Sequence, residues 1–277
     1  MSRAAPVRVT AREGGRPAAV TGHYFETDGD EFVPTPLARG PWSPDMLHGR
    51  LLGGLAARSL EGGYGDPGWR AARLTVDLFR PAAMKPVQIA LQPVREGRKV
   101  RVVDALITCD GHEVGRVTAV FLVTSEDPPG SIWRPDHEPW PDPDAVASDG
   151  TTGSAEHNGW LFRVVDGGMG TGARSRVWTN DTVELVAGEA MTPLVRAAVS
   201  GDIACPLVNF SDEGLYYINA DYTMVLGRYP VGDWVGVEST EQIQADGISA
   251  AMATLYDEQG PFATSGGSSL TRPPLED

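Results

Sequence analysis

The chain has 277 residues, enough for one large domain or two ordinary ones with a sizeable buried core. Lysine and arginine number 23 against 37 aspartate and glutamate, and the formal charge of −14 disfavours nucleic acid and anionic membranes as partners. No apolar run approaches the roughly eighteen residues of a membrane span, and the two cysteines allow at most one disulfide, so a cytoplasmic protein is predicted.

The first half of the chain predicts one helix followed by strands. Residues 1–19 carry scattered arginines without an apolar segment behind them and are expected to form a flexible tail. Leucine and alanine recur at helical spacing after residue 47, and Gly62 and Gly63 supply a stop, which predicts a helix over 48–61. Strand-like runs then follow within a first repeat of residues 20–124, at 74–79, 87–94, 100–108 and 114–123.

Residues 125–158 interrupt this pattern with prolines, acids, serines and glycines, which is typical of a linker. We expect this linker to lie over the surface and to be held there by Trp133 and Trp140.

The second half repeats the order of the first. Thr192 is a natural N-cap, Pro193 suits the first helical turn, and Gly201 is expected in the left-handed position at the end of the helix. Turn residues of the two halves lie 148 to 150 positions apart, as in Gly97 and Gly247, which indicates a duplication. The second repeat is predicted over 159–273, before a tail of 274–277, with strands at 216–226, 233–241, 248–256 and 262–270.

Residues 168–173 (GMGTGA) have the glycine spacing of a dinucleotide-binding turn. That motif needs a helix directly after it, because the helix N-terminus must face the pyrophosphate. Residues 174–186 have a strand-like pattern instead, so a glycine-rich turn is favoured.

Other catalytic signatures are missing from the sequence. His112 and Glu113 lack the second histidine of a zinc-protease helix, and no G-x-S-x-G nucleophile motif occurs. No spacing of cysteine and histidine is typical of a zinc site, so no metal is predicted.

Several motifs along the chain are specific when they are taken together. Residues 34–44 (PTPLARGPWSP), followed by His48 and Gly49 at the start of a helix, resemble the first half of the TesB-like acyl-CoA thioesterases, a family of double-hotdog proteins. The resemblance covers residues 20–273 and continues in residues 74–81 (LTVDLFRP), 95–100 (REGRKV), 218–221 (INAD) and 232–236 (GDWVG).

This resemblance implies an α+β double hotdog, in which each of two repeats wraps a bent antiparallel sheet around one long helix. It also implies a cofactor-independent hydrolase that acts on a small-molecule acyl thioester, linked to coenzyme A or to a carrier protein. By analogy with other hotdog proteins, a homodimer is expected.

Asp202 is the leading candidate for a catalytic residue. An acid at the C-terminal end of a helix opposes the helix dipole, so either a local turn contact or a functional role must explain it. The family resemblance implies that Asp202 activates water together with Asn219 and a glutamine on the last strand. Gly267 occupies the position of that glutamine.

The glycine at position 267 leaves three functions open. The hydrolase is expected to be weak, because one oriented hydrogen-bonding group is worth on the order of a hundredfold in rate, and Gly267→Gln is expected to raise its activity. Alternatively, the chain is a pathway-specific hotdog enzyme, such as a dehydratase, hydratase or cyclase. The third interpretation is a non-catalytic module that binds acyl thioesters.

Two further groups are predicted to contact substrate. His48 and Gly49 begin the first helix, whose free backbone N–H groups can polarise a thioester oxygen, although His48 can also be a capping or packing residue. The family has a second glycine where this chain has Arg50. Arg98 and Lys99 belong to a basic cluster suited to the phosphates of coenzyme A, with a solvated hairpin as the alternative.

Overall fold

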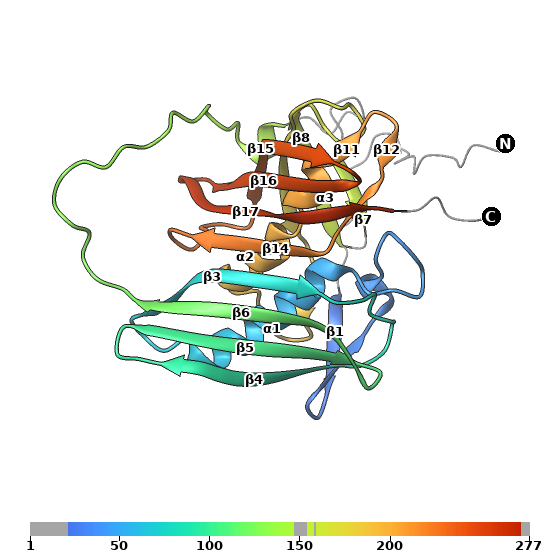
Figure 1. The fold of residues 1–277 in the computed structure, drawn as a ribbon, viewed down its shortest axis with the longest axis vertical. Helices are drawn as coiled ribbons and strands as arrows, with labels where there is room; N and C mark the ends of the chain where they lie inside the picture. Colours follow the sequence, from blue (N-terminus) through green and yellow to red (C-terminus); the bar gives the residue numbers. More distant parts are fainter. Residues whose placement is uncertain (1–21, 147–153, 158, 273–277) are drawn as a thin grey trace.

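A computed structural model describes residues 22–146, 154–157 and 159–272, and most of its strands join one long sheet (Figure 1). The tails predicted at 1–19 and 274–277 lie outside the described residues. The first half contains β1 (His23–Asp28), β2 (Glu31–Pro34), the 3-10 helix η1 (Pro36–Ala38), α1 (Gly49–Tyr64), β3 (Trp69–Leu78), β4 (Val87–Glu96), β5 (Val100–Cys109) and β6 (His112–Val123).

The remaining elements follow the linker. They are η2 (Pro143–Ala145), β7 (Ser154–His157), β8 (Trp160–Asp166), β9 (Arg176–Asp181), β10 (Glu184–Val186), α2 (Pro193–Gly201), α3 (Ala204–Val208), β11 (Phe210–Ser211), β12 (Gly214–Leu215), β13 (Tyr217–Asn219), β14 (Asp221–Leu226), β15 (Val235–Ala245), β16 (Ile248–Asp257) and β17 (Gly260–Thr271).

The sheet has the same strand order in both halves, which confirms the double hotdog. One half runs β1-β2-β4-β5-β6-β3 and the other continues as β14-β17-β16-β15-β9-β8, so β3 and β14 join the halves in the middle of Figure 1. These two strands pair antiparallel with Thr75 opposite Thr223, and the two hydroxyls are 3.1 Å apart. This pair therefore marks the pseudo-twofold axis.

The β-bulges of the two halves lie 148 positions apart in the sequence, the same separation as between Thr75 and Thr223. The pairing of β5 with β6 shifts after Ile107, and the pairing of β16 with β17 shifts after Leu255, 148 positions later. Ala71 lies opposite Phe121 just before the bulge of β3, and Asn219 lies opposite Ser269 just before Ala220 interrupts the second half. The backbone duplication thus extends to local irregularities that no turn motif predicts.

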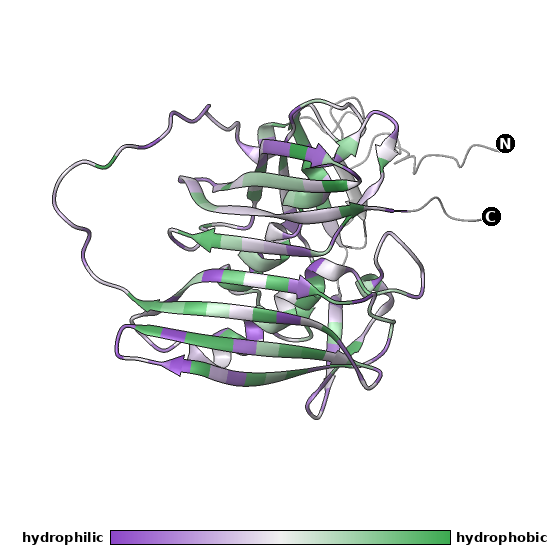
Figure 2. Cartoon of the chain, in the orientation of Figure 1, coloured by the Kyte–Doolittle hydropathy of each residue, from purple (hydrophilic) through white to green (hydrophobic). Residues whose placement is uncertain are grey.

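Alternating side chains place the core between the sheet and the helices. Strands β5 and β6 alternate buried apolar and more exposed positions, as the bands of colour along them in Figure 2 show. Helix α1 packs against α2 at Gly54, where a Cβ would lie 2.6 Å from a methyl group of Val199. Close contact of the two helices therefore requires glycine at this position.

The two helices run antiparallel. Near the end of α1, Glu61 accepts a hydrogen bond of 2.5 Å from Thr192, the N-cap of α2. Gly54, two turns earlier in α1, meets Val199 near the end of α2. The N-terminus of α1 therefore lies beside the C-terminus of α2 and the residue that follows it, Asp202.

The helix and strand predictions are largely confirmed, with two corrections at helix ends. Helix α1 continues to Tyr64 through Gly62 and Gly63, and it ends where the Gly65 N–H bonds to the Glu61 carbonyl at 2.8 Å. Gly201 is not left-handed, because the chain continues through Asp202 in helical conformation toward α3.

Gly201 is explained instead by crowding. Its carbonyl accepts a hydrogen bond of 2.8 Å from the Ser265 hydroxyl of β17, and a Cβ would lie 3.3 Å from both Met224 and Tyr222. The glycine thus lets the end of α2 approach the sheet closely.

The glycine-rich segment 168–173 is a turn, as predicted. Gly168, Gly170 and Gly172 all have positive φ, and strand β9 follows them in place of a helix. The nucleotide-binding interpretation is excluded by this geometry.

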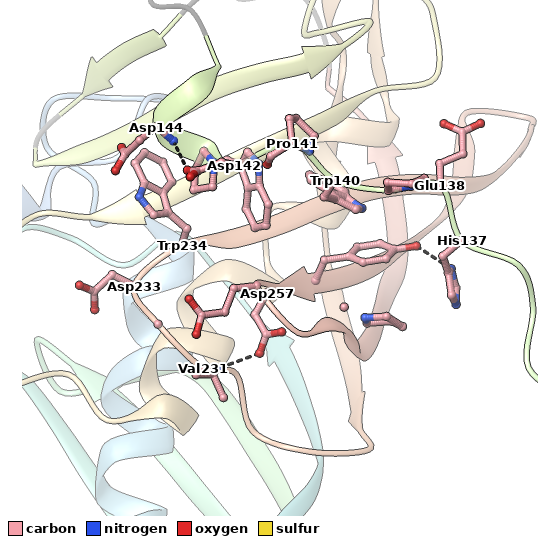
Figure 3. A pocket seen from close by; sticks show the side chains of 18 residues that line it. His137, Glu138, Trp140, Pro141, Asp142, Asp144, Val231, Asp233, Trp234 and Asp257 are labelled. Carbon is pink, nitrogen blue, oxygen red and sulfur yellow. Dashed lines mark hydrogen bonds between the residues drawn. The ribbon is translucent and has the colours of Figure 1, made fainter.

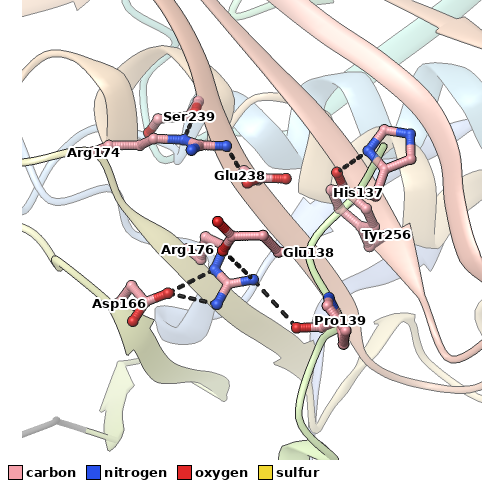
Figure 4. Close-up of polar contacts among 9 residues, drawn as sticks. All are labelled: His137, Glu138, Pro139, Asp166, Arg174, Arg176, Glu238, Ser239 and Tyr256. Atoms are coloured by element: carbon pink, nitrogen blue, oxygen red, sulfur yellow. Dashed lines mark hydrogen bonds and ion pairs between the residues drawn. The ribbon is translucent and has the colours of Figure 1, made fainter. Parts of the chain in front are cut away.

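The linker after β6 is anchored to the second half by its distal part. The Trp140 ring packs 4.7 Å from Trp178 and 4.9 Å from Tyr256, measured between ring centroids. Figure 4 shows the polar contacts nearby, in which His137 bonds the Tyr256 hydroxyl at 2.8 Å and Arg176 donates to the Pro139 carbonyl at 3.3 Å. Trp133 is 83% exposed, so its predicted anchoring role is wrong.

Replacing these two tryptophans is expected to have unequal effects. Trp140→Ala removes the aromatic contacts and is expected to lower the free energy of unfolding by roughly 3 kcal/mol, the low end for losing such a ring. Trp133→Ala is the matched control and is expected to change stability by less than about 0.5 kcal/mol. Chemical denaturation measures both variants, and equal losses would contradict the assignment.

Both cysteines are buried and unbonded to each other, so no disulfide supports this fold. Among the residues that the structure describes, no helix is both long and apolar enough to cross a membrane.

Candidate active site

Asp202 and Asn219 form a hydrogen-bonded pair at the end of α2. The Asn219 side-chain amide donates to Asp202 Oδ1 at 2.8 Å, from the end of β13. Asp202 is only 5% exposed, and it has helical conformation directly after the crowded Gly201. The structure therefore brings together two of the three residues predicted to be catalytic.

The environment of Asp202 gives it the acidity of a general base. Burial raises the pKa of its carboxyl from 3.8 to about 6, while the Asn219 hydrogen bond and the positive charge of Arg50 oppose this shift. A carboxylate with a pKa just below neutral is mostly ionised at pH 7 and still accepts a proton readily. Burial, and secondly the negative charge of Asp202, raises the pKa of both Tyr222 and Cys205.

The start of α1 lies at the same end of the helix pair as Asp202. His48 is the N-cap of α1, and its ring meets Trp160 edge-on at 5.7 Å. The Leu51 N–H bonds the His48 carbonyl at 3.0 Å, so the N–H groups of Gly49 and Arg50 are the ones without partners inside the helix, at the positive end of its dipole. Asp202 opposes the dipole of α2 but lies near the favourable end of α1.

Gly267 lies on the inward face of β17, where no side chain fits. A Cβ at this position would lie 2.9 Å from both the carbonyl carbon and Oδ1 of Asp221, and closer still to the carbonyl oxygen. The bulge between β13 and β14 brings this backbone close, and the Asp221 carboxylate is held by the backbone N–H and hydroxyl of Ser268. The strand is thus shaped for glycine, and an added glutamine would displace backbone.

Arg98 and Lys99 do not join this site. Both are exposed in the turn between β4 and β5, and Arg101 just beyond them bonds the carbonyl of Tyr64 at 3.1 Å. Their turn therefore lies near the C-terminal end of α1, a helix of 16 residues and so about 24 Å long. The site at Asp202 is near the other end.

Sequence reasoning missed a buried polar network at the start of α1. The Arg50 guanidinium is 2.7 Å from Asp181 Oδ1, and it also donates to the Tyr24 hydroxyl at 2.8 Å. The Tyr24 hydroxyl in turn donates to Asp181 at 2.6 Å. The available signal was the departure at position 50, where the resembling family has glycine, but its partners come from distant strands.

A separate cavity of about 590 Å³ lies between the linker and the second half (Figure 3). It is lined by residues that include Trp140 from the linker, Trp234 before β15, and Asp257 at the end of β16. Asp257 is bound by Arg228 and by the backbone N–H of Val231, so its carboxylate has a structural role. The cavity borders the turn at Gly260, about 30 Å along β17 from Ser269 beside Asn219.

Two family models match the sequence. The acyl-CoA thioesterase N-terminal domain matches residues 38–122, and the acyl-CoA thioesterase C-terminal domain matches residues 133–266. A search of the curated proteins finds no match.

Solved structures with the same fold include several thioesterases. A TesB protein of Mycobacterium avium subsp. paratuberculosis is 16% identical, with a TM-score of 0.67 over 90% of this chain and 96% of that one. The acyl-CoA thioesterase II TesB2 of Mycobacterium marinum is 17% identical, with a TM-score of 0.63 over 90% and 95% of the two chains. A hot dog protein of Alicyclobacillus acidocaldarius is 16% identical, with a TM-score of 0.69 over 91% and 96%. At such identity these likenesses concern the fold.

Proposed function

Because the chain belongs to the acyl-CoA thioesterase family, we propose that it hydrolyses acyl thioesters at the Asp202–Asn219 pair. The single observation that carries this assignment is a buried carboxylate that an amide holds at the junction of the two helices. The acyl group is attached to coenzyme A or to a carrier protein.

The proposed reaction needs only water and the thioester. Asp202 accepts a proton from a water molecule that Asn219 helps to hold, and the water oxygen attacks the carbonyl carbon. Backbone N–H groups at the start of α1 stabilise the negative charge that develops on the carbonyl oxygen. The carbon–sulfur bond then breaks, and Asp202 returns its proton to the leaving thiolate. Direct attack by Asp202 on the carbonyl is the alternative route, through a mixed anhydride.

We propose a low rate for this hydrolase, because Gly267 supplies no amide to orient the water. Each such group in a preorganised site contributes on the order of a hundredfold. Cytoplasmic location and assembly into a homodimer stay predictions.

The assay that tests the function uses the pure chain, a panel of acyl-CoAs and a reagent that detects free thiol. Release of coenzyme A thiol above the blank supports the hydrolase. Loss of water or of a double bond without thiol release would support a dehydratase or hydratase. Binding without any turnover would support a non-catalytic acyl-binding module.

The pH dependence of kcat is expected to follow the ionisation of Asp202. The general base must be ionised, and burial raises its pKa to about 6. Activity is therefore expected to rise roughly tenfold per pH unit below that value and to level off above pH 7. Steady-state rates between pH 5 and 8 measure this limb, and a flat profile would contradict a role for Asp202 as base.

A further inference from the structure

Arg50 is a buried cation in which one nitrogen has no hydrogen-bond partner among the described residues. Its side chain is 2% exposed at the second position of α1, where backbone N–H groups already gather. Its two terminal nitrogens bind Asp181 and Tyr24, and its Nε is buried without a hydrogen-bond partner among the described residues. A buried N–H without an acceptor costs free energy, so its persistence needs an explanation.

The network around Arg50 fixes the guanidinium in place. Asp181 Oδ2 accepts a hydrogen bond of 3.0 Å from one terminal nitrogen, and Asp181 Oδ1 lies 2.7 Å from the other in the ion pair. The Trp160 ring centroid lies 4.3 Å from the guanidinium carbon. Because Asp181 and Trp160 both hold the guanidinium, it cannot rotate to give Nε a partner without breaking the ion pair with Asp181. The unpaired N–H is therefore a preorganised donor.

The antiparallel helix pair places Arg50 beside the proposed catalytic carboxylate. Gly54 meets Val199, and one further turn in each direction leads to Arg50 in α1 and to Asp202 after α2. The positive charge of Arg50 lowers the pKa of Asp202, in agreement with this proximity. Asn219 binds only one of the two carboxylate oxygens of Asp202, Oδ1. The buried guanidinium of Arg50 and the buried carboxylate of Asp202 are therefore neighbours at the junction of the two helices.

We propose that Arg50 is a catalytic residue whose Nε–H donates a hydrogen bond to the carbonyl oxygen of the bound thioester. This assignment rests on the function proposed above. It adds a side-chain donor that stabilises the negative charge developing on the carbonyl oxygen. No covalent bond is formed to Arg50, and Arg50 releases no proton.

The test compares three variants by steady-state kinetics on the best acyl-CoA substrate. Arg50→Lys keeps the ion pair with Asp181 but has no Nε–H. The double variant Arg50→Met, Asp181→Leu removes both buried charges together, which leaves no unpaired ion in the core. Arg58→Lys is the matched control, because Arg58 lies two turns later in α1 and binds Glu189 at the surface.

Both Arg50 variants are expected to lose at least about 100-fold in kcat with KM changed less than about fivefold, while Arg58→Lys keeps wild-type kinetics. Thermal unfolding shows which variants are folded. If Arg50→Lys is not folded, the kinetics of the double variant decide the test. A folded Arg50 variant with kcat within threefold of wild type would overturn the proposal.

Binding to the wild-type chain gives a readout that does not depend on any variant. A ketone analogue of the acyl-CoA keeps the carbonyl, whereas a thioether analogue lacks it. The wild type is expected to bind the ketone at least about tenfold more tightly, and Arg50→Lys is expected to lose this preference. Equal affinity of the wild type for both analogues would overturn the proposal. Wild-type protein that binds neither analogue and hydrolyses no thioester would instead overturn the proposed function.

Discussion

Asp202→Asn is expected to lower kcat by about 10²- to 10⁴-fold while the fold stays intact. The substitution keeps the shape of the side chain but removes the proton acceptor, and a general base contributes a factor in this range. Asn219 still finds an oxygen at position 202 once the new amide is oriented toward it. The loss should therefore be in kcat, with KM little changed.

The same substitution is expected to stabilise the protein at high pH. Burial raises the pKa of Asp202 from 3.8 to about 6, so the folded state prefers the protonated acid. The wild type thus keeps this stability below about pH 4 and loses it as pH rises through 6, by roughly 3 kcal/mol at about 1.36 kcal/mol per pKa unit. Asparagine does not titrate, so Asp202→Asn lacks this loss.

Kinetics at pH 7.5 and thermal unfolding at pH 4 and 8 measure the two effects together. The variant should gain about 2–4 °C in Tm per kcal/mol relative to wild type on going from pH 4 to pH 8. Asp212→Asn, at an exposed acid in a turn, is the control for the charge change and should alter neither quantity. A folded Asp202→Asn with wild-type kcat would show that hydrolysis occurs elsewhere.

Gly267→Gln is expected to destabilise the chain by roughly 3 kcal/mol or more and to bring no gain in activity. The new Cβ would overlap the backbone of Asp221, which the bulge of the second half holds in place. Forcing atoms into a packed site typically costs 1–3 kcal/mol, and backbone yields less readily than a side chain. The gain in rate that family resemblance predicts for this substitution is therefore reversed by local geometry.

Thr264→Gln is the matched control, because Thr264 lies on the same strand and faces solvent. It should change the free energy of unfolding by less than about 0.5 kcal/mol, as measured by urea denaturation. A Gly267→Gln variant as stable as wild type would show that the bulge adapts. An increase in kcat would restore the original expectation that the missing amide limits the rate.

Much of the fold was predictable from period and spacing. Strand-like runs and turn glycines predicted eight segments that cover nine strands of the sheet, because alternation along a half-buried strand is a local property. The run predicted at 216–226 is divided at Ala220 into β13 and β14. Repeat spacing predicted the duplication, and Thr75 opposite Thr223 now shows its geometric origin. The pairing of Asp202 with Asn219 followed only from family resemblance, since nothing local links an acid after a helix to an amide on a strand.

The predictions that failed depend on tertiary contacts. Gly201 has the sequence signature of a helix stop, but crowding against β17 decides its role. Trp133 is apolar enough to anchor the linker, yet only Trp140 finds aromatic partners. The partners of Arg50 come from β1 and β9, and no spacing rule connects those strands to the start of α1.

The bulge that recurs after 148 positions has the same backbone shape in both halves of this duplicated chain but carries different side chains. Where the second half places Asn219 opposite Ser269, the first half places Ala71 opposite Phe121, and both of these are fully buried. Two subunits of a symmetric dimer would share one sequence and carry two identical sites. In a single polypeptide the two halves can differ in sequence, so one half fills this position with buried apolar side chains while the other keeps polar groups there. For the proposed hydrolase we therefore expect a binding stoichiometry of one thioester per chain rather than two.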